Sequence, residues 1–279
     1  MPWDQYEAEV ASEWQALLAS DPVESLVQKF LERNPAYLPG VDQYGSGHQS
    51  PQGGVLFTQP LLKGLHRDKC PDFMWIGTTS EVVTPVLIEI ERPGKKWFTQ
   101  VGQELTSEFH QAHGQLASWQ SWFLNPENQL TFRRTYLEWM IWDLSRRPIV
   151  PHYILIYGRR SELDDDWAGE LTHKRFSARR LNEEFMTYDR LTPNPTLKDV
   201  VTVHLNTSAK MEVRAIQPCF TTGPFTGELA ARCESPEPAL DAVPMWSEAR
   251  RDHVRDRWSF WADEHRRHMQ RPMSMETGE

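Results

Sequence analysis

The segment 82–90, VVTPVLIEI, limits what this chain can fold into more than any other feature. β-branched residues dominate it, which predicts a buried β-strand, and Pro85 suggests that the strand begins at a sheet edge or with a bulge. Glu91 follows Ile90, so two carboxylates stand at the end of the strand. Because positions two apart in a strand point to the same face, we expect Glu89 and Glu91 to project together while Ile90 enters the opposite core.

Two carboxylates on one strand face raise the free energy of the folded state unless a positive group meets them. A divalent cation that prefers oxygen ligands, such as Mg²⁺, is one such group. Asp72 precedes a second strand, predicted at 73–76, and would complete the site with Glu89 and Glu91. A metal held in this way can polarise a phosphodiester and lower the pKa of a bound water. The alternative is a solvated edge strand whose carboxylates bind nothing.

Three further features favour the metal site over the solvated edge. Glu32, on a predicted N-terminal helix, can approach the same cluster. Gln115 and Trp119 are four residues apart and share one face of the helix predicted after the strand. Lys95 and Lys96 follow a Pro-Gly turn directly beyond the carboxylates, in a place suited to backbone phosphates.

Periodicity predicts the other elements. Apolar residues at three- and four-residue spacing predict helices at 3–19, 21–34, 100–123, 130–144 and 246–269. For 130–144 a strand is the alternative, and in the second helix Asp21 is expected as the N-cap, with Pro22 as the first helical residue. Further strands are predicted at 55–58, 152–157, 200–205 and 211–216. Residues 39–53 are predicted as a loop and the proline-rich segment 234–244 as a linker.

The composition sets limits on the partners. The net charge of −9 counts against a protein that binds nucleic acid by bulk electrostatics, although a bound cation reverses the sign locally. Arg159 and Arg160 form one of several basic pairs, which fit either a phosphate-contacting surface or a solvated face. No run approaches the roughly 18 apolar residues of a membrane span. The N-terminus is acidic and shows no secretory signal, so we expect a cytoplasmic protein without membrane contact.

Soft metal ligands are scarce. The three cysteines stand far apart and are interpreted as structural or incidental. His110 and His113 are three residues apart on a predicted helix and could form a metal pair. Because no third soft ligand has a matching spacing, we favour two histidines on a helix face.

Six segments follow one another along the chain in a specific order and spacing: FLERNP (30–35), PDF (71–73), LIEIERPGKKWFT (87–99), QAHGQLASWQSWF (111–123), HYILIYGRR (152–160) and FMTYDRL (185–191). Together they resemble the Shedu family of bacterial anti-phage proteins, over roughly residues 22–218. The resemblance implies an α/β fold of the PD-(D/E)XK restriction-endonuclease-like type, in which helices flank a central mixed β-sheet. It also implies a Mg²⁺- or Mn²⁺-dependent DNA endonuclease or nickase that acts on phage DNA as a homo-oligomer.

The resemblance assigns roles to individual residues. Asp72 and Glu89 take the two acidic places, Gln115 the glutamine of the following helix, and Glu32 the acidic place on the first helix. The sequence departs from the superfamily at position 91, where glutamate replaces the usual lysine. Glu91 can then bind metal or act as a general base. A catalytically inactive nucleic-acid-binding or assembly module that kept the fold is the alternative to an active nuclease.

The chain is therefore divided into four parts: an N-terminal helix at 1–21, a Shedu-like nuclease domain at 22–218, a linker at 219–245, and a charged C-terminal helix and tail at 246–279. The C-terminal helix is expected to pack on the core or on a partner subunit.

Overall fold

A computed structural model gives the fold and describes residues 1–39, 51–138, 140, 144, 146–163, 168–206, 210–224, 226–233 and 235–270. Most of the loop predicted at 39–53, several residues of the helix predicted at 130–144 and the tail after residue 270 lie outside these ranges. Within the described ranges, no helix combines the length and the hydropathy that crossing a lipid bilayer requires.

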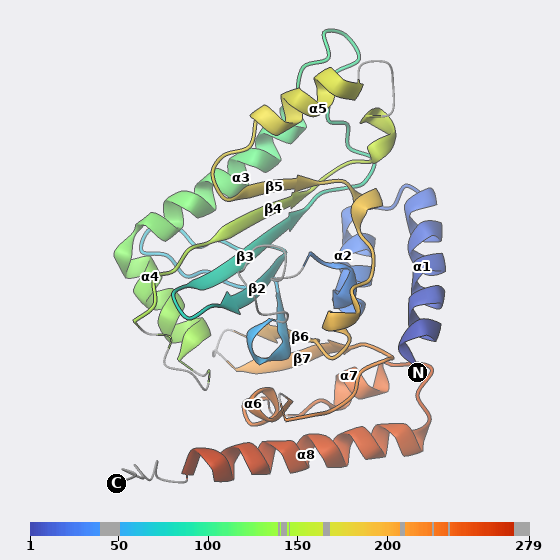
Figure 1. Cartoon of the computed structure of the whole chain (residues 1–279), viewed down its shortest axis with the longest axis vertical. Coiled ribbons are helices and arrows are strands. Elements are labelled where there is room, and N and C mark those ends of the chain that lie inside the picture. The colour runs from blue at the N-terminus through green and yellow to red at the C-terminus, as the bar shows by residue number, and fades with distance from the viewer. Residues whose placement is uncertain are drawn as a thin grey trace.

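A mixed sheet lies at the centre of the molecule, and its order among the described residues is β5-β4-β3-β2-β1-β6-β7 (Figure 1). The strands are β1 (Val55–Thr58), β2 (Phe73–Thr78), β3 (Val83–Ile90), β4 (His152–Ile156), β5 (Glu183–Met186), β6 (Val201–Leu205) and β7 (Met211–Ile216). β3 pairs antiparallel with β2 and parallel with β4. The predicted α/β class with a central mixed sheet is therefore confirmed, and β5 is a strand that the periodicity did not predict.

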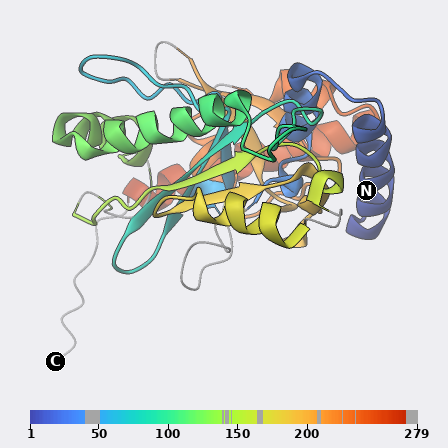
Figure 2. The ribbon, with the colours of Figure 1, turned by 90° about the horizontal axis from the view of Figure 1, so that it is seen from above.

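Helices flank this sheet. The α-helices are α1 (Trp3–Ala19), α2 (Glu24–Arg33), α3 (Ser107–Leu124), α4 (Pro126–Phe132), α5 (Ala168–Ser177), α6 (Thr226–Ala230), α7 (Glu237–Asp241) and α8 (Glu248–Gln270). α3 runs along one side of the strands, and α1 lies at the end of the molecule beyond α2 (Figures 1 and 2). α4 continues into a π-helical turn at Arg133–Leu137, so residues 130–137 of the segment predicted at 130–144 are helical and not a strand.

Successive side chains of the strands point to opposite faces of the sheet and pack in two separate hydrophobic cores. On β3, Leu87 packs in the core that contains α3, whereas Ile88 and Ile90 pack in the core that contains α1 and α2. Ile90 is 1% exposed, which confirms that it enters the core opposite to the face of its two glutamate neighbours.

β3 is an internal strand, so the interpretation of Pro85 as a sign of a sheet edge is wrong. Pro85 lies opposite Ile76 of β2, and the pairing with β4 begins one residue later at Val86. The N–H of Val83 donates to the carbonyl of Pro148, on the side of the strand that faces β4. The backbone nitrogen of Pro85 faces the same side, because positions two apart in a strand point the same way. The proline therefore sits before the β4 ladder starts, where no N–H donor is needed.

Two predicted helix starts are also wrong. α2 begins at Glu24 after Val23, without a side-chain cap, because Asp21 adopts a left-handed φ of 48° and pairs with Arg92 instead of capping the helix. α3 begins at Ser107 and not near residue 100, because the hydroxyl of Thr106 accepts a hydrogen bond from the N–H of Phe109. A capping hydroxyl of this kind fixes where a helix starts.

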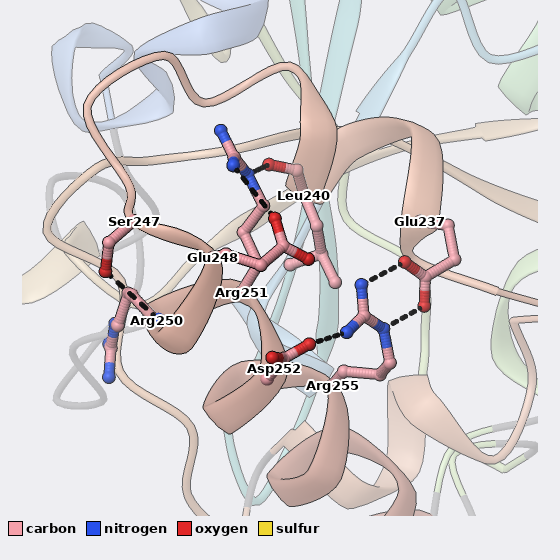
Figure 3. A network of polar contacts seen from close by, with 8 residues as sticks. All are labelled: Glu237, Leu240, Ser247, Glu248, Arg250, Arg251, Asp252 and Arg255. Carbon is pink, nitrogen blue, oxygen red and sulfur yellow. Dashed lines mark hydrogen bonds and ion pairs between the residues drawn. The ribbon is translucent and has the colours of Figure 1, made fainter.

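The C-terminal segment packs on the sheet. Val254 and Trp258 of α8 are buried at 0% and 4% exposure, so the predicted packing of this helix on the core is confirmed. The segment predicted as a linker instead folds into α6 and α7, because apolar residues such as Leu240 are fully buried. Arg255 of α8 reaches both carboxylate oxygens of Glu237 on α7, at 2.7 and 2.8 Å (Figure 3). Arg251 donates to the carbonyl of Leu240 in the same network (Figure 3).

Candidate metal centre

Asp72 and Glu89 face each other where β2 begins and β3 ends. In the antiparallel register Phe73 lies opposite Ile88, so Asp72 falls opposite Glu89 one step further along. The two side chains hydrogen-bond each other. Asp72 Oδ2 also accepts from the backbone N–H of Ile90 at 2.9 Å. Strand pairing, rather than a flexible loop, therefore brings the two carboxyl groups together.

Burial sets the ionisation of this pair. Desolvation raises the pKa of Asp72, although the Ile90 N–H opposes that rise. Desolvation also raises the pKa of Glu89, and the neighbouring charge of Asp72 raises it further. Because two neighbouring carboxylates repel when both are ionised, the pair holds a proton more tightly than two separate carboxyl groups would. A cation is the other means by which the pair can be neutralised.

Glu91 is turned toward a lysine. Its Oε2 lies 2.5 Å from Nζ of Lys95, and the two side chains are 9% and 26% exposed. Glu24, at the start of α2, hydrogen-bonds Glu91, and its pKa is raised first by burial and then by the charge of Glu91. The hydroxyl of Tyr188 donates to the backbone carbonyl of Glu91. These contacts fix the residue that follows β3 on both its side chain and its backbone.

The turn after β3 is clamped against the connection between α1 and α2. The N–H of Lys95 donates to the carbonyl of Arg92 at 3.0 Å, which closes the turn. Arg92 pairs with Asp21 Oδ2 at 2.5 Å. A Cβ on Gly94 would lie 2.2 Å from Asp21 Oδ1, so a larger residue there would displace the Asp21 side chain.

Two predicted site residues have other neighbours. Glu32 Oε1 accepts from the hydroxyl of Thr58 at 2.5 Å and from the amide of Gln28 at 3.4 Å. Gln115 is exposed on α3, and its backbone carbonyl accepts from the hydroxyl of Ser118. Neither side chain takes part in the contacts described above around Asp72 and Glu89.

The predicted phosphate-contacting residues lie beside acidic ones. Lys96 pairs with Glu162 at 3.4 Å and is 65% exposed. Arg159 pairs with Asp189 at 2.7 Å, and the backbone N–H of Arg160 donates to the same carboxylate. All of these ion pairs have at least one partly exposed partner, so they are weak in water.

A family comparison identifies the relationship of the chain. The model of the family described as Shedu protein SduA, C-terminal, matches residues 21–192, which is more than half of the chain. The chain belongs to this family. The match runs from the start of α2 past β5 and includes Asp72 and Glu89. No curated protein matches the chain significantly.

The donor set of the Shedu chain fits a hard cation in part. Among the described residues, no group of three or more histidine, cysteine, aspartate or glutamate side chains is gathered so as to hold a metal ion. The charge of Glu91 acts on both Asp72 and Glu89, and its side chain pairs with Lys95. Asp72 is half-buried and Glu89 is buried, and their two carboxyl groups are in contact. Mg²⁺ is commonly held by one or two carboxylates, with waters and substrate phosphates as its other ligands, so the pair fits.

Sequence reasoning missed Glu24. Glu24, Gln28 and Glu32 are spaced by four and therefore share one face of α2. By spacing alone, either Glu24 or Glu32 could occupy the acidic place on the first helix. The packing of α2 against the sheet determines which of the two lies next to the site.

His113 belongs to a different network in the Shedu chain. Its Nε2 lies 2.7 Å from Glu183 Oε2, whose side chain is 0% exposed. Gln120 donates to the other oxygen of Glu183 at 2.9 Å, and Arg180 binds the same carboxylate at 3.0 Å. The network ties α3 to β5, so His113 has a structural partner rather than a metal.

Proposed function

We propose that this Shedu chain is a divalent-metal-dependent DNA nuclease whose centre is the Asp72–Glu89 pair. Membership in the family indicates a Shedu-type defence protein. The observation that carries the nuclease proposal is the contact between the buried Glu89 and the half-buried Asp72, two carboxyl groups whose pKa values are both raised. Perturbed pairs of this kind concentrate at functional sites, because burying two acids together only weakens the fold.

Each residue of the centre has a role in this proposal. Asp72 and Glu89 would hold Mg²⁺ or Mn²⁺, and the N–H of Ile90 orients the Asp72 carboxylate. When bound, the cation polarises a phosphodiester and lowers the pKa of a bound water. Glu24 adds negative charge next to Glu91 and so contributes to the negative electrostatic potential of the site. Glu32 and Gln115 stay predicted members without a contact to the pair.

We further propose that the core is of the PD-(D/E)XK type. The arrangement of the chain is consistent with it: an acid precedes β2, a second acid ends β3, and the next long helix, α3, packs on the sheet. The glutamate at position 91 remains the departure from that pattern.

The proposed substrate is DNA, and for a defence protein phage DNA. A net charge of −9 means that affinity for DNA has to come from a local surface. Lys95, Lys96, Arg159 and Arg160 are the proposed contacts. In each of these ion pairs at least one side chain is in contact with water, so DNA phosphates can compete with the acidic partner for the lysine or arginine side chain. By resemblance to the family we also propose that the protein is a cytoplasmic homo-oligomer. Analytical ultracentrifugation can test the oligomeric state.

Cleavage of a supercoiled plasmid tests the proposed activity. Wild type, Asp72→Asn and Glu89→Gln are compared with Mg²⁺, with Mn²⁺ and with a chelator. Either substitution is expected to lower the cleavage rate by about 100-fold or more, because even groups that only orient metal ligands are worth about 10- to 100-fold. Glu212→Gln is the matched control, since Glu212 lies on β7 in a partly exposed pair with Arg214.

The outcomes separate the proposal from its rivals. Cleavage that is equal in wild type and Asp72→Asn contradicts the site. DNA binding without cleavage by wild type, even at high enzyme concentration, supports an inactive nucleic-acid-binding module. The absence of both binding and cleavage supports an assembly module.

A further inference from the structure

We propose that Glu91 is a positioning residue that holds the ammonium group of Lys95 at the edge of the acidic centre, where Lys95 binds a phosphate of the DNA strand. The inference rests on the proposed nuclease function. It takes Glu91 out of the set of metal ligands and general bases and gives it a different role.

The geometry of the pair carries this inference. Lys95 Nζ lies 2.5 Å from Glu91 Oε2, and the Glu91 side chain is only 9% exposed. A charge-assisted hydrogen bond between two ions is stronger than a neutral one. The ammonium group neutralises the charge of the carboxylate and occupies Oε2, which lowers the tendency of Glu91 to bind a cation or to take a proton from water. The ion pair therefore accounts for Glu91 without a metal.

The backbone around Lys95 is fixed from two sides. Gly94 packs against Asp21, and Asp21 pairs with Arg92 in the same turn. A Cβ on Gly158, which follows β4 with a φ of 59°, would lie 2.9 Å from the Lys95 carbonyl oxygen. Gly158 therefore allows the close approach of the Lys95 backbone, and Gly94 allows the contact with Asp21. A lysine that only solvated the surface would need no such support.

The charge of the surroundings explains why a phosphate would need Lys95. Glu24, Glu91, Asp72 and Glu89 interact electrostatically with one another and form one acidic cluster. A phosphodiester that approaches this cluster meets negative charge. The ammonium group has three N–H donors, and the bond to Glu91 uses one of them. Because the Lys95 side chain is 26% exposed, the remaining donors can reach a phosphate oxygen.

DNA binding without divalent metal tests the role of Lys95 separately from cleavage. A labelled duplex is titrated with wild type, Lys95→Gln, Lys95→Arg and Glu91→Gln over a range of salt concentrations. Lys198→Gln is the control with the same charge change, because Lys198 is exposed before β6, three strands away from β3. Thermal melting confirms that each variant is folded.

We expect Lys95→Gln to bind DNA more weakly and to lower the slope of log Kd against log salt by about 1, the value for one phosphate contact. Lys95→Arg should keep the slope, since it keeps the cation. Glu91→Gln should weaken DNA binding in the same direction while Mn²⁺ binding, measured by calorimetry, stays unchanged or becomes tighter.

Three results would overturn the inference. One is a Lys95→Gln variant with the DNA affinity and salt slope of wild type, and another is a wild type that binds no DNA. The third is a Glu91→Gln variant that loses Mn²⁺ binding as Asp72→Asn does, because Glu91 would then be a metal ligand. If wild type binds DNA but neither binds Mn²⁺ nor cleaves, the proposed nuclease function fails, and the salt slope of Lys95→Gln still decides the role of Lys95.

Discussion

Asp72 lies directly across the β2–β3 pairing from Glu89, and the two side chains hydrogen-bond each other. The backbone ladder imposes this contact, so neither acid can leave it without disturbing two internal strands of the sheet. Raised pKa values in both groups are the consequence, with desolvation as the largest cause. In the proposed function, a divalent cation neutralises this pair.

The two acids of α2 should differ in their effect on cleavage. Glu24 hydrogen-bonds Glu91, whereas Glu32 bonds Thr58. Glu24→Gln is expected to lower the cleavage rate by about 10-fold, as loss of a group near a metal site does. Glu32→Gln should have a smaller effect on the rate and should cost about 1 kcal/mol of stability through the weakened bond to Thr58. Cleavage rates and urea unfolding of both variants measure this, and an equal or larger loss of rate in Glu32→Gln contradicts it.

Alanine at two exposed glycines should give opposite changes in stability. In Gly94→Ala the new Cβ meets Asp21, so the Asp21 side chain has to move away from Arg92. We expect a loss of about 1 kcal/mol, the upper value for an exposed ion pair, together with slower cleavage because the turn that carries Lys95 shifts. Gly114→Ala is the matched control: nothing lies within 4 Å of its Cβ in α3.

The control should gain about 0.5–1 kcal/mol, because glycine inside a helix is unfavourable relative to alanine. Urea unfolding measures both variants. A Gly94→Ala variant that is as stable and as active as wild type shows that the clamp around the turn has no role.

Acid should weaken the fold through Glu183. Burial raises the pKa of this carboxyl, but hydrogen bonds from His113 and Arg180 outweigh burial and hold the pKa below its ordinary range. A carboxyl with a lowered pKa in the folded state contributes stability above its unfolded pKa of about 4.3 and loses it as the pH falls through the folded value. We expect Glu183→Gln to be less stable than wild type by about 1–3 kcal/mol near neutral pH.

The difference between Glu183→Gln and wild type should shrink as the pH falls below about 4, since wild type then also loses the charge. Urea unfolding at a series of pH values follows both proteins. A stability difference that is constant from neutral to acid pH rules out the linkage.

β3, the strand that carries Glu89, could be predicted from the sequence because its pattern is local. Alternation placed Ile90 in the core opposite to the glutamates, and the structure confirms it. The start of α2 could not be predicted in this way. Asp21-Pro22 matches the residue preference for the start of a helix. In the structure, however, Asp21 pairs with Arg92, which lies 71 positions away in the sequence.

The composition of the centre depended on tertiary contacts as well. Their spacing places Glu24 and Glu32 on one face of α2, and spacing alone does not show which of the two lies at the site. Lys95 follows a Pro-Gly turn whose direction is set by Asp21 and by Gly158, both from other parts of the chain. The ion pair between Lys95 and Glu91 is therefore a property of the fold that no motif in the sequence shows.

The most direct test of the central claim is a crystal structure with Mn²⁺, in which anomalous scattering locates the ion. We predict an anomalous peak about 2.0–2.6 Å from carboxylate oxygens of both Asp72 and Glu89, as metal–oxygen bonds require, and its loss in Asp72→Asn. Glu91 should keep its bond to Lys95 in that structure. Crystals with Mn²⁺ in excess that show no peak at the pair, or a peak elsewhere that survives Asp72→Asn, would contradict the account.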